Sequence, residues 1–165
     1  EEVAREVGSS DIAYVQVEAV LAQCDLFLNE GAALQEKTQK AQKSWAQKEQ
    51  NLQAEAAQLQ EKYQKGLITT NDAQAQQQSI EKRVASYQSS AQKEAQALDE
   101  ENYVFTNRAQ DLLHRAVQEI NGDKKYKLII NATALIDADS TLNITPAVLA
   151  KVNELYAADK KAVKK

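Results

Sequence analysis

The hydrophobic pattern changes its period close to the start of the chain. Residues 12–17 read Ile-Ala-Tyr-Val-Gln-Val, and this β-branched and aromatic run predicts a strand that is buried on most of its surface. From Glu18 the larger apolar residues recur at helical spacing, which predicts a short helix. Residues 29–31, Asn-Glu-Gly, predict the end of that helix.

Two long stretches with coiled-coil spacing follow, separated by one turn. From residue 32 to residue 65 there is no Pro or Gly, and the apolar positions alternate steps of four and three. Residues 65–72 include Gly66 and several helix-capping residues, so we expect the chain to reverse there. The same spacing continues to Ile120, and the two stretches together predict a long antiparallel helical hairpin. The apolar seam is expected to contain Leu34, Ala41, Trp45, Leu52, Ala56, Leu59 and Tyr63 in the first helix and Ile80, Val84, Tyr87, Ala91, Ala95, Leu98, Asn102, Phe105, Ala109, Leu112, Ala116 and Ile120 in the second.

The pattern returns to short extended pieces after the hairpin. Residues 121–123 end the second helix, and residues 126–131 predict a second strand. A third short strand is predicted at 134–136, and a further extended piece at 142–144. Thr145-Pro146 places a capping hydroxyl before a proline, which predicts the start of a final helix. The predicted fold class is therefore α+β, with a small β body and a long antiparallel α-helical coiled-coil hairpin.

This order of elements divides the chain into a body and an arm. We expect residues 11–30 and 121–160 to form a discontinuous β-rich body, and residues 31–120 to form the arm, with its tip near 65–72. Residues 1–10 are expected to be a flexible lead.

The predicted body has too few residues to bury a good core by itself. Cys24 is the only cysteine, so no internal disulfide can compensate. We therefore predict an obligate oligomer, in which open strand edges continue into the sheet of a neighbouring copy and close a shared barrel. The core of this shared body is expected to contain Ile12, Tyr14, Val15, Leu128 and Ile130.

Composition and charge fit long solvated helices. The 165 residues include 27 Ala and 20 Gln but only 4 Gly and 1 Pro, and no run of 18 apolar residues is present. The net charge of −4 gives no support for nucleic-acid binding, which we do not expect. Residues 31–120 carry 11 basic and 12 acidic groups, a mixture that can meet many surfaces weakly.

Nothing in the sequence favours catalysis or a cofactor. It contains no phosphate-binding Gly-rich loop, and His114 and Cys24 are each the only residue of their type. Asp137 and Asp139 flank a predicted turn, where a carboxylate ordinarily accepts main-chain hydrogen bonds. We expect a non-enzymatic protein without metal or cofactor.

Two blocks of the sequence resemble the Skp/OmpH family of periplasmic chaperones. The family opens with a strand of the form Ile-Ala-x-Val, which is residues 12–15 here. It closes with a strand, an Asn-Ala or Ala-Asn turn, a short strand and a Thr-capped final helix, and the corresponding residues here are 128–134 and 143–149. The resemblance covers residues 12–160 and implies a homotrimer, in which strands of three copies form a barrel and three hairpins surround a cavity. It also implies an ATP-independent holdase, which binds unfolded outer-membrane proteins in that cavity and prevents their aggregation in the periplasm.

Other features of the sequence bear on partners and location. The chain begins Glu1-Glu2 and contains no methionine, so we expect its natural start to have been removed, which permits a cleaved export signal. Well-known family members are basic, and the acidic charge of this chain argues against direct contact with lipid or lipopolysaccharide.

The tip of the hairpin contains the candidate client contacts. These are Tyr63, Leu67, Ile68 and Tyr87, which could equally serve only to hold the hairpin together. A structural or adaptor coiled-coil protein that binds one folded partner is the alternative function. A prefoldin-like chaperone fits less well, because its strands lie between its two long helices, where this chain has only a short turn.

Overall fold

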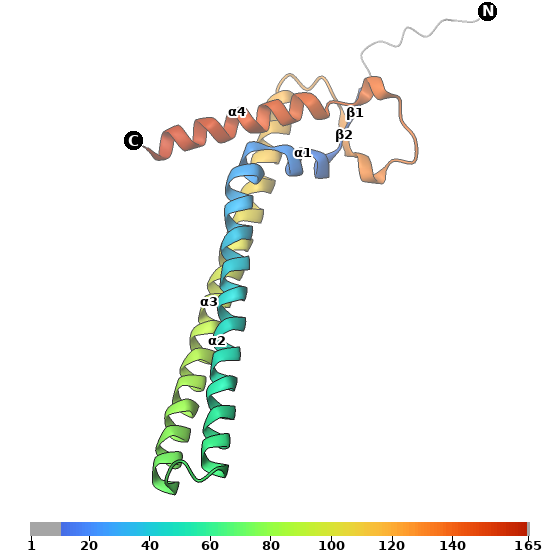
Figure 1. Cartoon of the computed structure of the whole chain (residues 1–165). Helices are drawn as coiled ribbons and strands as arrows, with labels where there is room; N and C mark the ends of the chain where they lie inside the picture. Colours follow the sequence, from blue (N-terminus) through green and yellow to red (C-terminus); the bar gives the residue numbers. More distant parts are fainter. Residues whose placement is uncertain (1–10, 165) are drawn as a thin grey trace, which may run out of the picture. The chain divides into compact units, whose positions relative to one another are not determined.

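The computed structural model describes residues 11–164, and most of these residues are helical. The elements in chain order are β1 (Ile12–Val15), α1 (Val17–Gln23), the π-helical turn η1 (Phe27–Gly31), α2 (Ala32–Gln64), α3 (Thr70–Ile120), β2 (Leu128–Asn131), the 3₁₀ turns η2 (Ala132–Ala134) and η3 (Ser140–Leu142), and α4 (Thr145–Val163). They form two compact units (Figure 1). Residues 33–103 are the hairpin unit, and residues 11–32 with 104–164 are the body unit. The predicted flexible lead, 1–10, lies outside the described residues.

The hairpin unit consists of α2 and the first part of α3, which lie side by side and run in opposite directions (Figure 1). Leu59, Ile80 and Leu98 are buried at predicted seam positions, so the coiled-coil spacing identified this contact correctly. Tyr63 and Asn102 were also predicted in the seam but are exposed. Tyr63 is one residue from the end of α2, where no further turn covers it, and an amide such as Asn102 is better solvated outside an apolar contact.

The reversal between α2 and α3 occurs where the sequence predicts it. Gly66 has a φ of +68°, a left-handed conformation that a residue with a Cβ adopts only with strain. Thr69 then accepts a hydrogen bond at its hydroxyl from the main-chain N–H of Asp72, at 3.1 Å, and so caps the start of α3.

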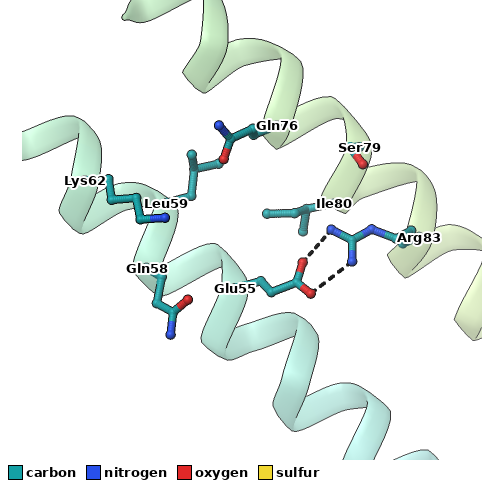
Figure 2. Close-up of a pocket in the computed structure, with 8 residues that line it drawn as sticks. All are labelled: Glu55, Gln58, Leu59, Lys62, Gln76, Ser79, Ile80 and Arg83. Atoms are coloured by element: carbon teal, nitrogen blue, oxygen red, sulfur yellow. Dashed lines mark hydrogen bonds and ion pairs between the residues drawn. The ribbon is translucent and has the colours of Figure 1, made fainter. Parts of the chain in front are cut away.

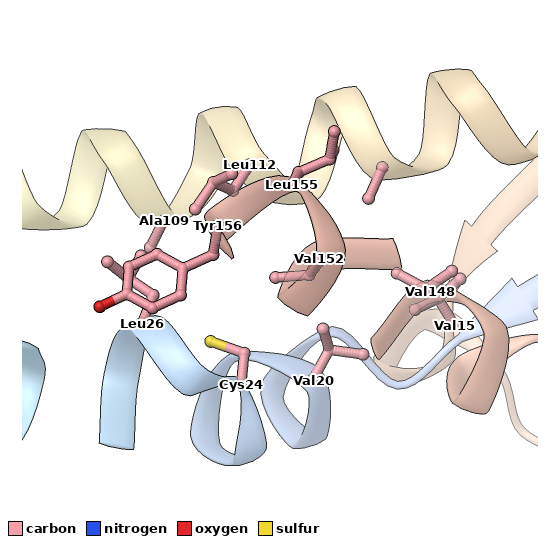
Figure 3. Packing of buried hydrophobic residues seen from close by; sticks show 11 residues of the cluster. Val15, Val20, Cys24, Leu26, Ala109, Leu112, Val148, Val152, Leu155 and Tyr156 are labelled. Atoms are coloured by element: carbon pink, nitrogen blue, oxygen red, sulfur yellow. The ribbon is translucent and has the colours of Figure 1, made fainter. Parts of the chain in front are cut away.

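The core of the body unit is mainly helix packed against helix. α1, the end of α3 and α4 supply most of its buried side chains, and β1 supplies Val15 (Figure 3). Ala109, Leu112 and Ala116 belong to this core, so these α3 residues have a different partner from the first hairpin helix that the periodicity predicted. Periodicity identifies the apolar face of a helix but not the element that covers it.

The body contains fewer strands than the sequence predicted. β1 and β2 form a parallel pair of four residues each, in which Ile12 is opposite Leu128 and Val15 is opposite Asn131. The prediction of a third strand at 134–136 is wrong. The side chain of Asn131 accepts a hydrogen bond from the N–H of Thr133, and this local bond starts the 3₁₀ turn η2 in its place.

β1 has neighbours on both of its edges. β2 lies along one edge, and on the other the main-chain N–H of Ile144 donates to the carbonyl of Tyr14 at 3.0 Å. Asn143 forms an isolated bridge with Tyr14, so the extended piece predicted at 142–144 is found only in part. Within residues 11–164, β2 pairs with β1 alone, and its second edge is free of strand partners. A free edge of this kind is a place where another strand can add.

The prediction of a helix end at 29–31 is wrong. α1 ends earlier, where Cys24 has an extended ψ of 152°, and the chain then passes through η1 directly into α2. Gly31 does not end the helix; it allows a close contact with the ring of Phe105. A Cβ at this position would lie 3.0 Å from Cζ of Phe105, so a larger residue would require that ring to move by a few tenths of an ångström.

Side-chain hydrogen bonds fix the start of α4. Asn143 Oδ1 accepts from the main-chain N–H of Thr145 at 3.0 Å, a local turn bond just before α4, whereas the capping bond expected of Thr145 is not found. The Thr145 hydroxyl instead accepts from the N–H of Gln16 at 2.9 Å and donates to Asn143. The start of α1 is therefore tied to the start of α4.

The turn after α3 is held by one asparagine. Nδ2 of Asn121 donates to the carbonyl of Tyr126, and Oδ1 of Asn121 accepts from the N–H of Tyr126, both at 2.9 Å. The amide thus makes both hydrogen bonds that a neighbouring strand residue would make. This arrangement directs the chain from α3 into β2.

Two of the ion pairs in the body unit connect α3 to η1 and to α4. Arg108 lies 2.5 Å from Glu30, which also accepts a hydrogen bond from the Tyr156 hydroxyl at 3.1 Å. Arg115 binds Asp159 through both carboxylate oxygens, at 2.8 and 3.1 Å. Burial alone raises the pKa of Glu30, but its bonds to Arg108 and Tyr156 hold that pKa below its ordinary value. The hydrogen bond from Arg115 likewise lowers the pKa of Asp159.

The body unit is expected to lose stability in acid through these carboxylates. Because their pKa values are lower in the folded chain, the stabilisation is present above the ordinary values of 4.5 for Glu30 and 3.8 for Asp159. It is lost as the pH falls through the folded pKa values. Arg115→Gln removes the hydrogen bond that lowers the pKa of Asp159. The free energy of unfolding should therefore become less dependent on pH in this range. Urea unfolding at several values between about pH 7 and pH 3 measures this.

Lys161→Gln is the matched control, since Lys161 is an exposed cation on the same helix, α4. It should leave the acid dependence unchanged. If the free energy of unfolding depended on pH equally in Arg115→Gln and in the parent chain, the Arg115–Asp159 pair would not be a source of the acid sensitivity.

Candidate functional site

The described residues show no arrangement typical of a catalytic centre. Among residues 11–164, no group of three or more His, Cys, Asp or Glu side chains is placed to hold a metal ion. His114 is exposed, and Cys24 is buried in the body core, as expected of a small apolar residue. In the same part of the chain, no helix combines the length and apolarity required to cross a bilayer.

The tip of the hairpin exposes apolar side chains. Leu67 is 68% exposed and Tyr63 is 48% exposed, whereas Ile68 is half-buried. The main-chain N–H of Leu67 donates to the carbonyl of Lys62 at 2.9 Å, so the turn holds this leucine in an ordered position. The structure therefore brings three of the four candidate client contacts to one turn, where Tyr63 and Leu67 are accessible to a partner.

Tyr87 lies elsewhere on the hairpin. It is about five helical turns from the start of α3 and is half-buried. Its hydroxyl donates to the main-chain carbonyl of Trp45 at 3.1 Å, and Trp45 Nε1 donates to Glu94 at 2.6 Å. These bonds join α2 to α3, so the interaction that the structure assigns to Tyr87 is within the hairpin. Whether its ring also contacts a client stays a prediction.

Polar and charged pairs flank the apolar seam of the hairpin. Arg83 on α3 binds Glu55 on α2 through both carboxylate oxygens, beside buried Leu59 and Ile80 (Figure 2). The hydrogen bond from Arg83 lowers the pKa of Glu55. A shallow groove at this point is lined mainly by polar side chains. Such a surface can form many weak contacts but has no enclosed pocket for a small ligand.

The parallel strand pair carries an exposed apolar surface on the body unit. Ile12 and Leu128 are opposite each other in the register and are 45% and 51% exposed. Tyr14 and Ile130 are half-buried, whereas Val15 is already buried in the core of the single chain. The five predicted body residues therefore share one strand pair, and two of them remain accessible in one copy. Their burial in an oligomer stays a prediction.

An apolar groove lies next to this strand pair. Val15, Val17, Leu113, Val117, Ile129 and Ile130 supply its apolar lining, with Gln110, His114 and Asn131 as its polar members. Neither Ile12 nor Leu128 lines this groove, which is instead formed between the strand pair and α3.

Several exposed apolar residues were not identified from the sequence. They are Leu28, Tyr103, Val104, Ile136 and Val163. Ile136 was assigned to a strand that does not form, so its full exposure could not be anticipated from alternation. Tyr103 follows Asn102, which was predicted in the seam but is itself exposed, so periodicity gave no reliable signal for the exposure of Tyr103.

The polar contacts across the hairpin were also missed. Lys37 pairs with Glu101, and Glu55 pairs with Arg83, in addition to the bond between Trp45 and Glu94. Charged residues beside a coiled-coil seam are the available sequence signal for such pairs. Their register depends on where the turn lies, which spacing alone does not determine.

Comparison with known proteins identifies the protein family. The chain combines a helical hairpin with a small body that contains one strand pair, and a family model described as "Outer membrane protein (OmpH-like)" matches residues 11–152. Because the match covers most of the chain, the protein belongs to the OmpH-like family. No curated protein matches the chain.

A solved structure has the same fold. It is the crystal structure of a Caulobacter crescentus CB15 protein that is described as an OmpH-like outer membrane chaperone. The match has a TM-score of 0.74 and 16% sequence identity, and it covers 88% of this chain and 85% of the other. At this identity the similarity concerns the fold.

Removing the Tyr87 hydroxyl should weaken the hairpin. Tyr87→Phe deletes the bond to the Trp45 carbonyl, and we expect the free energy of unfolding to fall by about 1 kcal/mol. Urea unfolding followed by the fluorescence of Trp45, the only tryptophan, measures the change. In the control Tyr63→Phe the ring is exposed, and the change should stay below about 0.5 kcal/mol. An equal effect of the two substitutions would contradict the structural role of Tyr87.

Proposed function

We propose that this protein is an ATP-independent holdase chaperone, which binds unfolded outer-membrane proteins and prevents their aggregation in the periplasm. Membership of the OmpH-like family supports a chaperone role, and the description of the similar Caulobacter protein agrees with it. The observation that carries the proposal is the exposure of Tyr63 and Leu67 on a hairpin whose other surfaces are largely polar. No cofactor or catalytic group is required for such binding.

The physical requirements of a holdase fit this surface. An unfolded β-barrel precursor exposes many apolar segments, and it aggregates when these segments meet those of other molecules. A chaperone that must later release the client intact needs many weak contacts. Accessible apolar residues at the tip, together with mixed charges and glutamines along the helices, provide contacts of this strength.

We further propose that three copies assemble through their bodies. The free edge of β2 and the exposed side chains of Ile12 and Leu128 support a sheet shared between copies, with the client held between the hairpins. Direct binding of lipid is not part of the proposal, since the chain has a net charge of −4.

The tip is tested by removing its aliphatic side chains. The double variant Leu67→Ser/Ile68→Ser should bind unfolded clients about tenfold more weakly, because two apolar contacts are lost. The measurement is suppression of aggregation after at least two unrelated outer-membrane proteins are diluted from urea, with native mass spectrometry to count the subunits.

Val163→Ser is the matched control, since Val163 is 87% exposed and lies at the end of α4. It should bind clients as the parent chain does. Unchanged holding by the double variant would remove the tip from the mechanism. If the parent chain bound only one native partner and no unfolded clients, the adaptor function would replace the holdase.

The shared sheet is tested at Leu128. Leu128→Lys places a charge on the exposed apolar surface of the strand pair, and it should dissociate the oligomer at micromolar concentration because a buried unpaired charge is costly. Sedimentation velocity reports the subunit number, and far-ultraviolet circular dichroism reports the retained helices. Val163→Lys should sediment as the parent chain does. An intact oligomer in Leu128→Lys would show that the copies do not assemble through this surface.

A further inference from the structure

The helix α2 carries a second regular pattern, which lies outside its apolar seam. Nine exposed positions between residues 35 and 64 follow one another in steps of three and four. Seven of these positions are glutamine and two are alanine, so none of them is charged. We call this set the glutamine stripe, and its members are Gln35, Gln39, Gln42, Ala46, Gln50, Gln53, Ala57, Gln60 and Gln64.

The charged residues that pair with α3 lie on the opposite side of α2. Because an α-helix turns by about 100° per residue, the nine positions of the stripe fall within a sector of about 80°. Lys37 and Glu55, which pair with Glu101 and Arg83 respectively, lie about 140° from either edge of this sector. Figure 2 shows the second of these pairs. α2 therefore has one side on which charges are paired across the hairpin and another side without charge.

The side-chain amides of the stripe have unused capacity for hydrogen bonds. Within residues 11–164, Gln53 is the one glutamine of the stripe that has a side-chain hydrogen bond, a long contact of 3.5 Å with Glu49. Each of the other six amides has two N–H donors and a carbonyl acceptor available to a partner. The stripe thus presents regularly spaced donors and acceptors to any molecule that lies along α2.

The main chain of an unfolded protein has the complementary groups. It exposes an unpaired N–H and C=O at every residue except proline, whatever the side chains are, and a glutamine amide can bond to either group. Positions of the stripe repeat about every 5 Å along the helix, whereas residues on one side of an extended chain repeat about every 6.7 Å. Because these spacings differ, few bonds form at once. The contact therefore stays weak and does not depend on the sequence of the partner.

We propose that the glutamine stripe binds the main chain of unfolded clients through its side-chain amides. This inference rests on the proposed holdase function and names the part of the client that α2 recognises. An uncharged surface does not repel a client of either net charge, so acidic and basic clients should bind to it equally well.

Removing three amides tests the stripe. The variant Gln42→Ala/Gln50→Ala/Gln60→Ala lacks their donors and acceptors, and alanine preserves the helix because its helical propensity is the highest. It should bind unfolded clients about fivefold more weakly than the parent chain, since several weak hydrogen bonds are lost. The measurement is the dissociation constant for two labelled outer-membrane proteins of different net charge, each diluted from urea and followed by fluorescence anisotropy. The fold loss should be equal for both.

Gln47→Ala/Gln58→Ala/Gln76→Ala is the matched control. All three are exposed glutamines of the hairpin unit outside the stripe, and Gln58 and Gln76 lie beside the pair of Glu55 with Arg83 (Figure 2). This variant should bind clients as the parent chain does, and both variants should have the subunit number of the parent in sedimentation velocity.

Four results would overturn the stripe as a client site. They are unchanged binding by the stripe variant, equal weakening by the two triple variants, a loss confined to one client, and a lower subunit number in the stripe variant alone. A loss confined to one client would indicate recognition of particular side chains, and a lower subunit number would indicate a contact between copies. In each of these cases the parent chain still holds clients. Failure of the parent chain to bind any unfolded client would instead overturn the holdase, and the stripe proposal with it.

Discussion

Close contact between three helices holds the body unit together, and small side chains on α3 make this contact possible. Ala109 and Ala116 are buried where α1 and α4 pack against α3, next to Leu112. An alanine lets a neighbouring helix approach closely, whereas a larger residue would force it away. The strand pair depends on this packing, because two strands of four residues do not form a stable sheet in isolation.

The sequence was sufficient to predict the elements that have a strong repeat. The alternating steps of three and four identified α2 and α3, and Gly66 identified the reversal between them. The first two strands were also predicted, from their β-branched composition. Partners were harder to predict, because an apolar face has the same pattern whether it meets the other hairpin helix or, as at Leu112, the body core.

Short polar signals gave less reliable results than the repeats. Gly31 was interpreted as a helix end, although its lack of a side chain serves the approach of Phe105. Asn131 and Asn143 each redirect the chain through one side-chain bond. In the first case this bond replaced a predicted strand, and in the second it lies just before α4, where the expected threonine cap is not found. Such choices depend on contacts with distant residues, which no local window of sequence contains.

The candidate surfaces were predicted in part for the same reason. Leu67 is accessible at the tip, as expected of a turn residue, but Tyr87 proved to bond across the hairpin to a residue far away in the sequence. The charged pairs that flank the seam depend on the register of two helices, which the position of a single turn determines. In a surface that binds through many weak contacts, no single residue identifies the site. The sequence therefore predicts the composition of such a surface better than its boundaries.

The asparagine that bonds to both main-chain groups of Tyr126 has a consequence for the chemical ageing of the protein. Asn121 is followed by Gly122, a pair that deamidates readily in an unconstrained peptide, because the glycine nitrogen can attack the side-chain amide. Here both ends of that amide are engaged, and the Gly122 N–H donates to the carbonyl of Glu119. The folded turn thus restrains the two groups that must react, and deamidation at this site would accumulate in molecules that have spent time unfolded.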